Sequence, residues 1–258
     1  MESRPTLEVQ NQHVTIRSFT NEDIPEKLLL PILEAGRRSP TSSNMQAYSI
    51  IVVRDQDVKR ELAILAGNQK HIEACPVFLA FCADLHRLNH VCELHDAKMT
   101  NNLETFLIST IDASVVGMSV QTGAESVGLG AVMIGSMRNH PQEVAELLGL
   151  PPRVYVTFGM CLGWPIKENI PPQKPRLPSG LVIHREKYDT SNPASQIESH
   201  DTELGRHYES LDKNLDQSAW SGVIARNLSR PLRSSLKMTL EEMGFNISGE
   251  GQKSSNES

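Results

Sequence analysis

The sequence predicts a three-layer protein of the α+β or α/β class, in which helices cover a central sheet. Two observations support this prediction. Apolar runs of strand length alternate with helical patterns between residues 49 and 160. The segment from about 101 to 127 is apolar on nearly every side and carries small residues, which predicts a long, deeply buried helix that another backbone can approach closely.

Composition is typical of a soluble globular protein, and we expect a cytoplasmic one. It has 258 residues, 39% of them hydrophobic and 22% charged, which is enough to bury a sizeable core. We found neither an apolar run near the roughly 20 residues of a membrane span nor the apolar core of a signal peptide. The four cysteines lack C-x-x-C spacing, which favours free buried thiols over disulfides or a zinc site.

The net charge argues against two classes of partner. A formal charge of −6 gives no general attraction to nucleic acid or to an anionic membrane, so we expect neither. Any anionic ligand must therefore be held by a local group of cations.

The first predicted elements lie between residues 25 and 83. Pro40 biases the residue before it towards extended backbone, so the first helix should end near Arg38. Gly67 suits the end of a second helix. The elements expected here are a helix at about 25–38, a strand at 49–54, a helix at 55–66 and a central strand at 77–83.

The second half begins with the long helix at 101–127. A strand at 131–134, a short helix at 141–148, a buried strand at 154–160, a helix around 201–211 and an amphipathic helix at about 231–243 follow it. Several prolines after residue 165 predict an extended arm that wraps over the core or over a second subunit. We assign residues 1–165 to a core, 166–245 to the arm and C-terminal helices of the same domain, and 246–258 to a disordered tail.

The loop from 37 to 49 combines small hydroxyls and amides with no carboxylate. An ordinary polar loop has this composition, because Ser, Thr and Asn bond their own backbone. The other interpretation is that this loop forms one wall of a ligand site. It depends on cations at three separate polar corners, which would hold a phosphate if the fold brought them together. Each pair alone is typical of a solvated surface. The pairs are His13 with Arg17, Lys70 with His71, and Lys174 with Arg176.

A glycine-rich element, Gly128-Leu129-Gly130 through Gly135-Ser136, follows the long helix. A dinucleotide fingerprint would follow a strand and open a helix, whereas this element follows a helix and opens a strand. Helix capping explains it as well as a backbone that approaches a flat ligand.

Two other kinds of site are disfavoured. His86, His90, Cys92 and His95 match no familiar zinc spacing, so we expect no metal. Ser42 and Ser43 lack the G-x-S-x-G turn of a serine hydrolase.

Six motifs, in this order, resemble the flavin reductase and oxygen-insensitive nitroreductase family, in particular its NADPH-dependent branch. They are His-x-Thr-Ile-Arg at 13–17, Thr-Ser-Ser-Asn-Met-Gln at 41–46, Gly-Asn-Gln-Lys-His at 67–71, the glycine-rich element through Arg138-Asn139, Phe-Gly-x-x-Leu-Gly-Trp-Pro at 158–165 and Lys-Pro-Arg-Leu-Pro at 174–178. The resemblance covers about residues 13 to 245.

The resemblance implies a nitroreductase-like α+β sandwich with a mixed or antiparallel sheet, whose C-terminal excursion wraps a homodimer. It also implies one FMN at each of two interface sites. Carried over by position, the cofactor-binding residues are His13, Val14, Thr15, Ile16, Arg17, Thr41, Gln46, Gln69, Lys70, His71, Met133, Ile134, Gly135, Ser136, Lys174 and Arg176. The substrate-binding residues would be Ser43, Asn44, Lys213 and Arg230.

The implied activity is an FMN-dependent NAD(P)H oxidoreductase with ping-pong turnover. Hydride would pass from NADPH or NADH through flavin N5 to nitroaromatics, quinones or free flavin, so no catalytic side chain is expected. Asp212 and Asp216 flank Lys213 and would repel the 2′-phosphate of NADPH, which leaves donor preference open. The alternative is an FMN-binding storage or redox-sensing protein on the same fold.

Overall fold

The computed structural model describes residues 4–191, 193–212 and 220–248. At its centre lies a four-stranded sheet in which every neighbouring pair is antiparallel. In spatial order the strands are β1 (Tyr48–Val53), β2 (Val77–Asp84), β4 (Val154–Gly163) and β3 (Gly130–Ile134). The α+β class is therefore confirmed, and β1 and β3 form the two opposite edges of the sheet.

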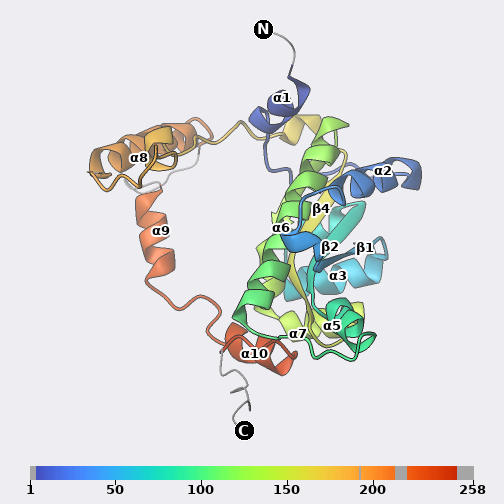
Figure 1. The fold of residues 1–258 in the computed structure, drawn as a ribbon. Coiled ribbons are helices and arrows are strands. Elements are labelled where there is room, and N and C mark those ends of the chain that lie inside the picture. The colour runs from blue at the N-terminus through green and yellow to red at the C-terminus, as the bar shows by residue number, and fades with distance from the viewer. Residues whose placement is uncertain (1–3, 192, 213–219, 249–258) are drawn as a thin grey trace. The chain divides into compact units, whose positions relative to one another are not determined.

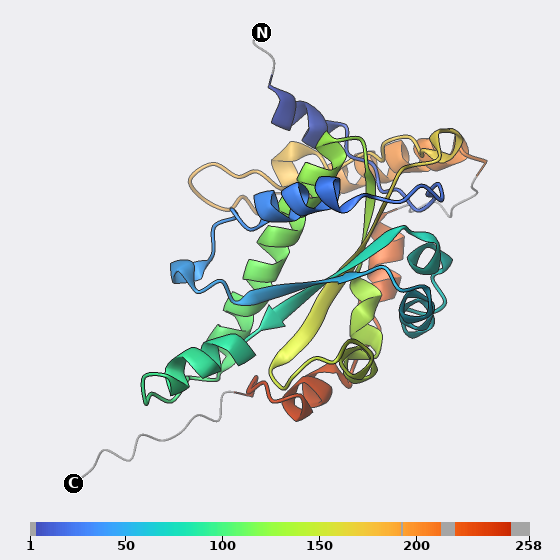
Figure 2. The same cartoon turned by 90° about the vertical axis from the view of Figure 1, so that its right-hand side faces the viewer.

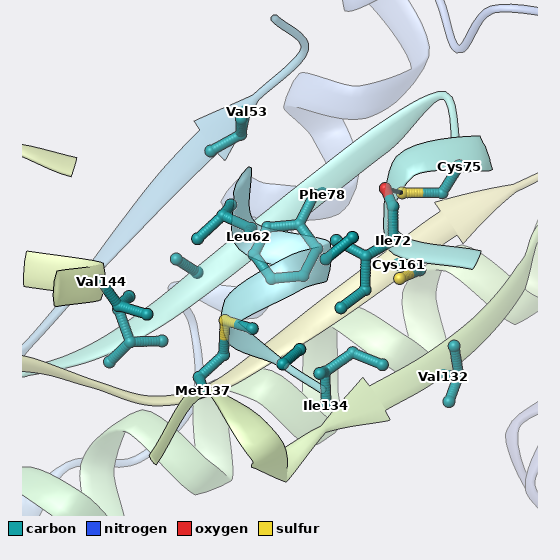
Figure 3. Close-up of a cluster of buried hydrophobic side chains, with 14 of the residues drawn as sticks. Val53, Leu62, Ile72, Cys75, Phe78, Val132, Ile134, Met137, Val144 and Cys161 are labelled. Carbon is teal, nitrogen blue, oxygen red and sulfur yellow. Dashed lines mark hydrogen bonds between the residues drawn. The ribbon is translucent and has the colours of Figure 1, made fainter. Parts of the chain in front are cut away.

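Helices cover both faces of this sheet, as predicted. Residues of α2 (Glu26–Gly36) and α6 (Leu103–Ser126) form one buried cluster with the sheet, and residues of α3 (Gln56–Leu65), α4 (Lys70–Ala74) and α7 (Pro141–Leu148) form another. Figure 2 shows the green helix α6 and the blue-green helices α3 and α4 on opposite sides of the strands. Figure 3 shows the second cluster, in which Phe78 lies among Leu62, Ile72 and Met137.

The two central strands are buried along their whole length. Their almost uninterrupted apolar sequence suits strands that are covered on both faces. Phe81 of β2 and Phe158 of β4 stack with ring centroids 5.0 Å apart. A Cβ added at Gly117 of α6 would lie 2.4 Å from the Phe158 ring. The small residues of the long helix therefore allow the close approach that the sequence predicted.

One prediction about α6 is wrong, because only one side of this helix is buried in the chain. Its outer side carries apolar residues that are each at least 40% exposed: Leu103, Leu107, Ile111 and Met118. Contrary to the sequence-based expectation, α6 is also long and apolar enough to cross a membrane, although the core helices of soluble proteins pass the same test. It packs here against α2 and the sheet.

Short helices account for most other differences from the predicted elements. The helices α1 (Pro5–Asn11), α5 (His86–Glu93) and α9 (Ser221–Leu228) were not expected. The final helix, α10 (Leu236–Glu242), is shorter than the predicted 231–243 because Arg233 takes a φ of 48°, which no right-handed helix allows. The helix expected around 201–211 begins earlier, as α8 (Ala194–Glu209).

The chain forms two compact units (Figure 1). The first comprises Met1–Pro171 with Ser235–Ser258, and the second comprises Pro172–Ser234. In the second unit Asp201 of α8 accepts hydrogen bonds from the backbone N–H groups of Trp220 and Ser221, both at 2.8 Å. This carboxylate fixes the start of α9 against α8.

Candidate functional site

The segment from 13 to 17 is fixed along the edge strand β3. The backbone N–H of Ile16 donates to the carbonyl oxygen of Ala131 at 3.0 Å. A Cβ added at Gly130 would lie 2.7 Å from the Ile16 side chain, so only glycine permits this approach. Ile16 is buried and Arg17 beside it is exposed. The segment thus presents the Arg17 guanidinium at the β3 edge.

His13 contacts a carboxylate that the sequence analysis did not identify. Its Nδ1 lies 2.6 Å from Oε1 of Glu125, and Gln121 Nε2 lies 3.0 Å from both of these atoms. Glu125 and Gln121 are one turn apart on α6 and face the same side. The corner predicted to be purely cationic therefore includes a negative charge, which orients the His13 ring.

Two of the predicted motifs meet through a side-chain hydrogen bond. Gln69 Nε2 donates to the Ser136 hydroxyl oxygen at 2.5 Å and to the carbonyl oxygen of Ala66 at 2.8 Å. Gln69 directly precedes α4, and Ser136 follows β3. This bond confirms that the motif at 67–71 and the glycine-rich element lie side by side, which their separation in sequence did not establish.

His71 is half-buried, and its Nε2 is a buried atom without a hydrogen-bond partner among the described residues. Burial lowers the pKa of His71 below its ordinary value, and the nearby charge of Arg17 lowers it further. The imidazole is therefore neutral at pH 7. The expected pair of cations at Lys70 and His71 reduces to Lys70, while His71 brings an unsatisfied nitrogen close to Arg17.

Three of the predicted cofactor residues direct their side chains into the core. Ile16 and Ile134 are buried in the same cluster, and Val14 packs against it. Only their backbone groups can face a ligand. Met133, by contrast, is exposed on β3, and Gly135 and Ser136 beyond it are half-buried. The end of β3 therefore offers one apolar side chain followed by backbone and a small hydroxyl.

The loop from 41 to 47 lies at the other edge of the sheet, where it leads into β1. Three strand spacings of about 4.8 Å place this edge roughly 14 Å from β3. The loop is anchored at Asp112 of α6, and the 13–17 segment is anchored at Glu125 of the same helix. These two anchors are thirteen helical residues apart, which corresponds to roughly 20 Å. A single chain thus does not bring Thr41, Ser43, Asn44 and Gln46 to the predicted residues at β3.

A buried carboxylate holds this loop. Asp112 is 1% exposed. Its Oδ1 accepts a hydrogen bond from the backbone N–H of Ser42, and its Oδ2 accepts one from the backbone N–H of Ala47, both at 3.0 Å. The loop itself contains no carboxylate, but α6 supplies one from beneath it. A polar residue next to Ala113 and one turn before Val116, both buried, was the signal that the sequence analysis missed.

Further predicted residues belong to the second unit. Lys174 Nζ lies 5.6 Å from the centroid of the Tyr208 ring. Lys174, Arg176 and Tyr208 line a cavity of about 630 Å³ together with His200, Leu204 and Trp220. Arg230 is exposed, and Lys213 lies outside the described residues.

The histidine-rich segment at 86–95 forms α5 and the turn after it. Across the described ranges, no three His, Cys, Asp or Glu residues are grouped to hold a metal ion. All four cysteines are free thiols, as predicted, although Cys92 is only partly buried.

Comparison with known proteins gives a consistent result over nearly the whole chain. The model of the nitroreductase family matches residues 11–164, and that of the nitroreductase family C-terminal domain matches residues 174–248. The FMN reductase [NAD(P)H] of Bacillus subtilis is 37% identical over 239 residues, which cover 91% of this chain and 95% of that protein. The oxygen-insensitive NADPH nitroreductase of Salmonella typhimurium is 36% identical over 241 residues, covering 93% and 98%.

Solved structures are also similar to this chain over nearly its whole length. The NADPH:FMN oxidoreductase of Vibrio harveyi complexed with NAD+ superposes with a TM-score of 0.85 at 34% identity, covering 94% of this chain and 99% of that one. The hypothetical oxidoreductase YcnD of Bacillus subtilis superposes with a TM-score of 0.90 at 35% identity, covering 95% and 99%.

Proposed function

The chain belongs to the nitroreductase family, and on that premise we propose that it is an FMN-dependent NAD(P)H oxidoreductase that reduces nitroaromatic compounds, quinones or free flavin. Its relatives include FMN reductases and NADPH nitroreductases that match over more than nine tenths of their length. The observation that carries the proposal is the hydrogen bond between Gln69 and Ser136, because it assembles a polar edge beside Arg17 and His71 at the end of β3.

The residues at the end of β3 fit a flavin mononucleotide. A flavin needs an apolar surface for its ring, neutral donors and acceptors for its pyrimidine edge and cations for its phosphate. Met133 offers the apolar surface, Gln69 and Ser136 the neutral polar groups, and Arg17 an exposed cation. The buried Nε2 of His71 also has no partner among the described residues, so a hydrogen-bonding group on the cofactor would satisfy it.

Each group then has a definite task. Arg17 would hold the phosphate, with Lys174 and Arg176 as the further cations that the family resemblance assigns to it. The Gln69 amide, fixed by Ala66 and Ser136, would orient the pyrimidine edge. Bound FMN supplies the hydride acceptance and donation, so the protein needs no nucleophile of its own. The side chains bind, orient and supply local positive charge.

We further propose that the working form is a homodimer whose sites contain both chains. The 13–17 segment and the 41–47 loop lie on opposite edges of one sheet, so a complete site takes the loop from a second copy. The exposed apolar side of α6 supports this proposal, because Leu103, Leu107 and Ile111 recur every four residues and form one stripe. A two-fold axis near α6 would bury the stripe and form two equal sites.

The proposal is tested by the spectrum and the reactivity of the purified protein. It should be yellow, with one FMN per chain, and anaerobic mixing with NADPH or NADH should bleach the flavin absorbance. Repeated turnover with a nitroaromatic acceptor separates an enzyme from a storage or sensing protein, which would bleach once without rapid reoxidation. A colourless protein that does not take up added FMN would refute the proposal.

The bleaching rates with the two donors also decide donor preference. We propose that both donors are accepted, because Asp212 carries a negative charge beside the residue expected to meet the 2′-phosphate. We also propose a cytoplasmic location, since NADPH and NADH are both present in the cytoplasm.

A further inference from the structure

The loop from 42 to 47 has an unfavourable backbone. Ser43, Asn44 and Gln46 have φ values of 46°, 58° and 51°, in the left-handed region that residues other than glycine seldom adopt. All three side chains are exposed, so core packing does not impose this shape. Something else must hold the loop in it.

Asp112 meets this need from beneath the loop. Its two carboxylate oxygens accept the backbone N–H groups of Ser42 and Ala47, which bracket the three strained residues. Both bonds are charge-assisted, and the carboxylate is almost completely buried, so water does not compete for it. After the loop, Arg87 donates to the carbonyl oxygen of Tyr48 and pairs with Asp84 at 3.1 Å, which fixes the start of β1.

The chemistry of this contact demands a carboxylate. Both partners are donors, and an ionised carboxylate is a side chain of this size with two acceptors and no donor. An amide in its place would accept one N–H and turn its own N–H₂ group towards the other. One end of the loop would then be released while the volume of the side chain stayed the same.

The loop also shapes the space around it. Met45, at its centre, lines a cleft of about 580 Å³ that includes Tyr48 and Arg87, and it also lines an apolar cavity of about 230 Å³ that includes Cys92 and Ile108. A shift of the loop therefore changes both spaces, as well as the positions of Ser43 and Asn44.

We propose that Asp112 is a positioning residue, which holds the loop 42–47 in a preset conformation and thereby selects the acceptors that the enzyme reduces. This inference rests on the proposed function, together with the assignment of Ser43 and Asn44 as substrate-binding residues that the family resemblance implies. Asp112 does not itself touch the acceptor. It acts through the two backbone N–H groups.

The first test compares Asp112→Asn with Ser109→Ala on the same helix. Ser109 is buried too, but its hydroxyl bonds only the carbonyl oxygen of Phe106 within α6, so it is a matched control. In Asp112→Asn the KM for nitroaromatic acceptors should rise roughly tenfold, which is the effect of losing one charge-assisted hydrogen bond. Because Gln46 of this loop is one of the expected cofactor-binding residues, FMN content and the rate of bleaching by NADPH are measured in parallel, and both should change less than the acceptor KM does. The ratio of the kcat/KM values for a bulky and a small acceptor should move closer to one.

The second test reads the loop directly, without turnover. Amide hydrogen exchange at Ser42 and Ala47 should be at least about tenfold faster in Asp112→Asn than in the wild type, and unchanged in Ser109→Ala. Should Asp112→Asn not fold, Ser42→Pro replaces it, since this variant deletes the Ser42 donor and leaves the acid, and exchange is then measured at Ala47 alone. Thr41 is already extended at φ −130° and ψ 154°, as a residue before proline prefers.

Two results would overturn the inference. Acceptor KM values and exchange rates equal to those of Ser109→Ala would show that the loop holds its shape without Asp112. A parallel loss of FMN, bleaching and turnover would show a general structural role and no selective positioning. A wild-type protein that binds no FMN would instead refute the proposed function, and the exchange measurement would still decide whether Asp112 holds the loop.

Discussion

Replacing Gly130 with alanine should displace the 13–17 segment from the sheet and weaken cofactor binding. The added Cβ would lie 2.7 Å from Cβ of Ile16, well inside van der Waals contact, and Ile16 is itself packed in the core. Overpacking of this kind costs about 1–3 kcal/mol. Loss of the bond from Ile16 N–H to the Ala131 carbonyl adds about 1 kcal/mol. We therefore expect a loss of about 2–4 kcal/mol in the free energy of unfolding.

The assay pairs urea unfolding with titration of FMN into the apoprotein. Arg17 directly follows Ile16, so part of the displacement should reach the phosphate contact, and each 1.4 kcal/mol lost there raises Kd about tenfold. Gly123→Ala is the matched control. Its Cβ would meet Ile32 only at 3.4 Å, and alanine is the better helix former, so this variant should be as stable as the wild type or up to about 1 kcal/mol more stable. A Gly130→Ala protein with unchanged stability and unchanged Kd would refute the reasoning.

Three further predictions concern charge, protonation and assembly. Arg17→Ala combined with Arg176→Ala should raise the Kd for FMN by at least about a hundredfold while riboflavin, which lacks the phosphate, binds as before; equal losses for both ligands would contradict the phosphate assignment. Since the pKa of His71 is lowered in the folded protein, the unfolded chain binds its proton first as the pH falls. Wild-type stability in urea should thus decline as the pH falls below the ordinary histidine pKa of 6.5, and His71→Gln should lessen this decline; identical slopes would show that His71 is not the group. Ile111→Glu, which places a charge in the exposed stripe of α6, should convert the proposed dimer into monomers in sedimentation analysis, whereas Glu104→Gln on the same helix should not; a dimeric Ile111→Glu protein would place the interface elsewhere.

The sequence predicts the layers of this fold well because its strongest signals are local. The continuous apolar runs of β2 and β4 and the length of α6 follow from composition and periodicity alone. The late start of α10 does not, because Leu232 fits the helical pattern while the backbone at Arg233 has a non-helical φ. The hydrophobic pattern indicates which face of a helix a residue prefers, but it does not indicate where a short helix begins.

Some features of the candidate site could likewise be predicted from the sequence, and others could not. The motifs identify Gln69 and Ser136, but only the fold shows that they are bonded. Asp112 and Glu125 were missed because a carboxylate on an apolar helix has no characteristic spacing, and their partners are backbone or imidazole groups far away in sequence. The order of the strands, which separates the loop from the 13–17 segment, depends on pairing between distant residues and cannot be read from either motif.

The placement of these two segments on opposite edges of one sheet has a genetic consequence. In the proposed homodimer, a chain with a damaged 13–17 segment and a chain with a damaged 42–47 loop would each be inactive alone, since every site in either homodimer would lack one half. When the two chains are refolded together, each mixed dimer unites both lesions in one site and leaves the other site intact. Two inactive alleles of this gene would then complement one another.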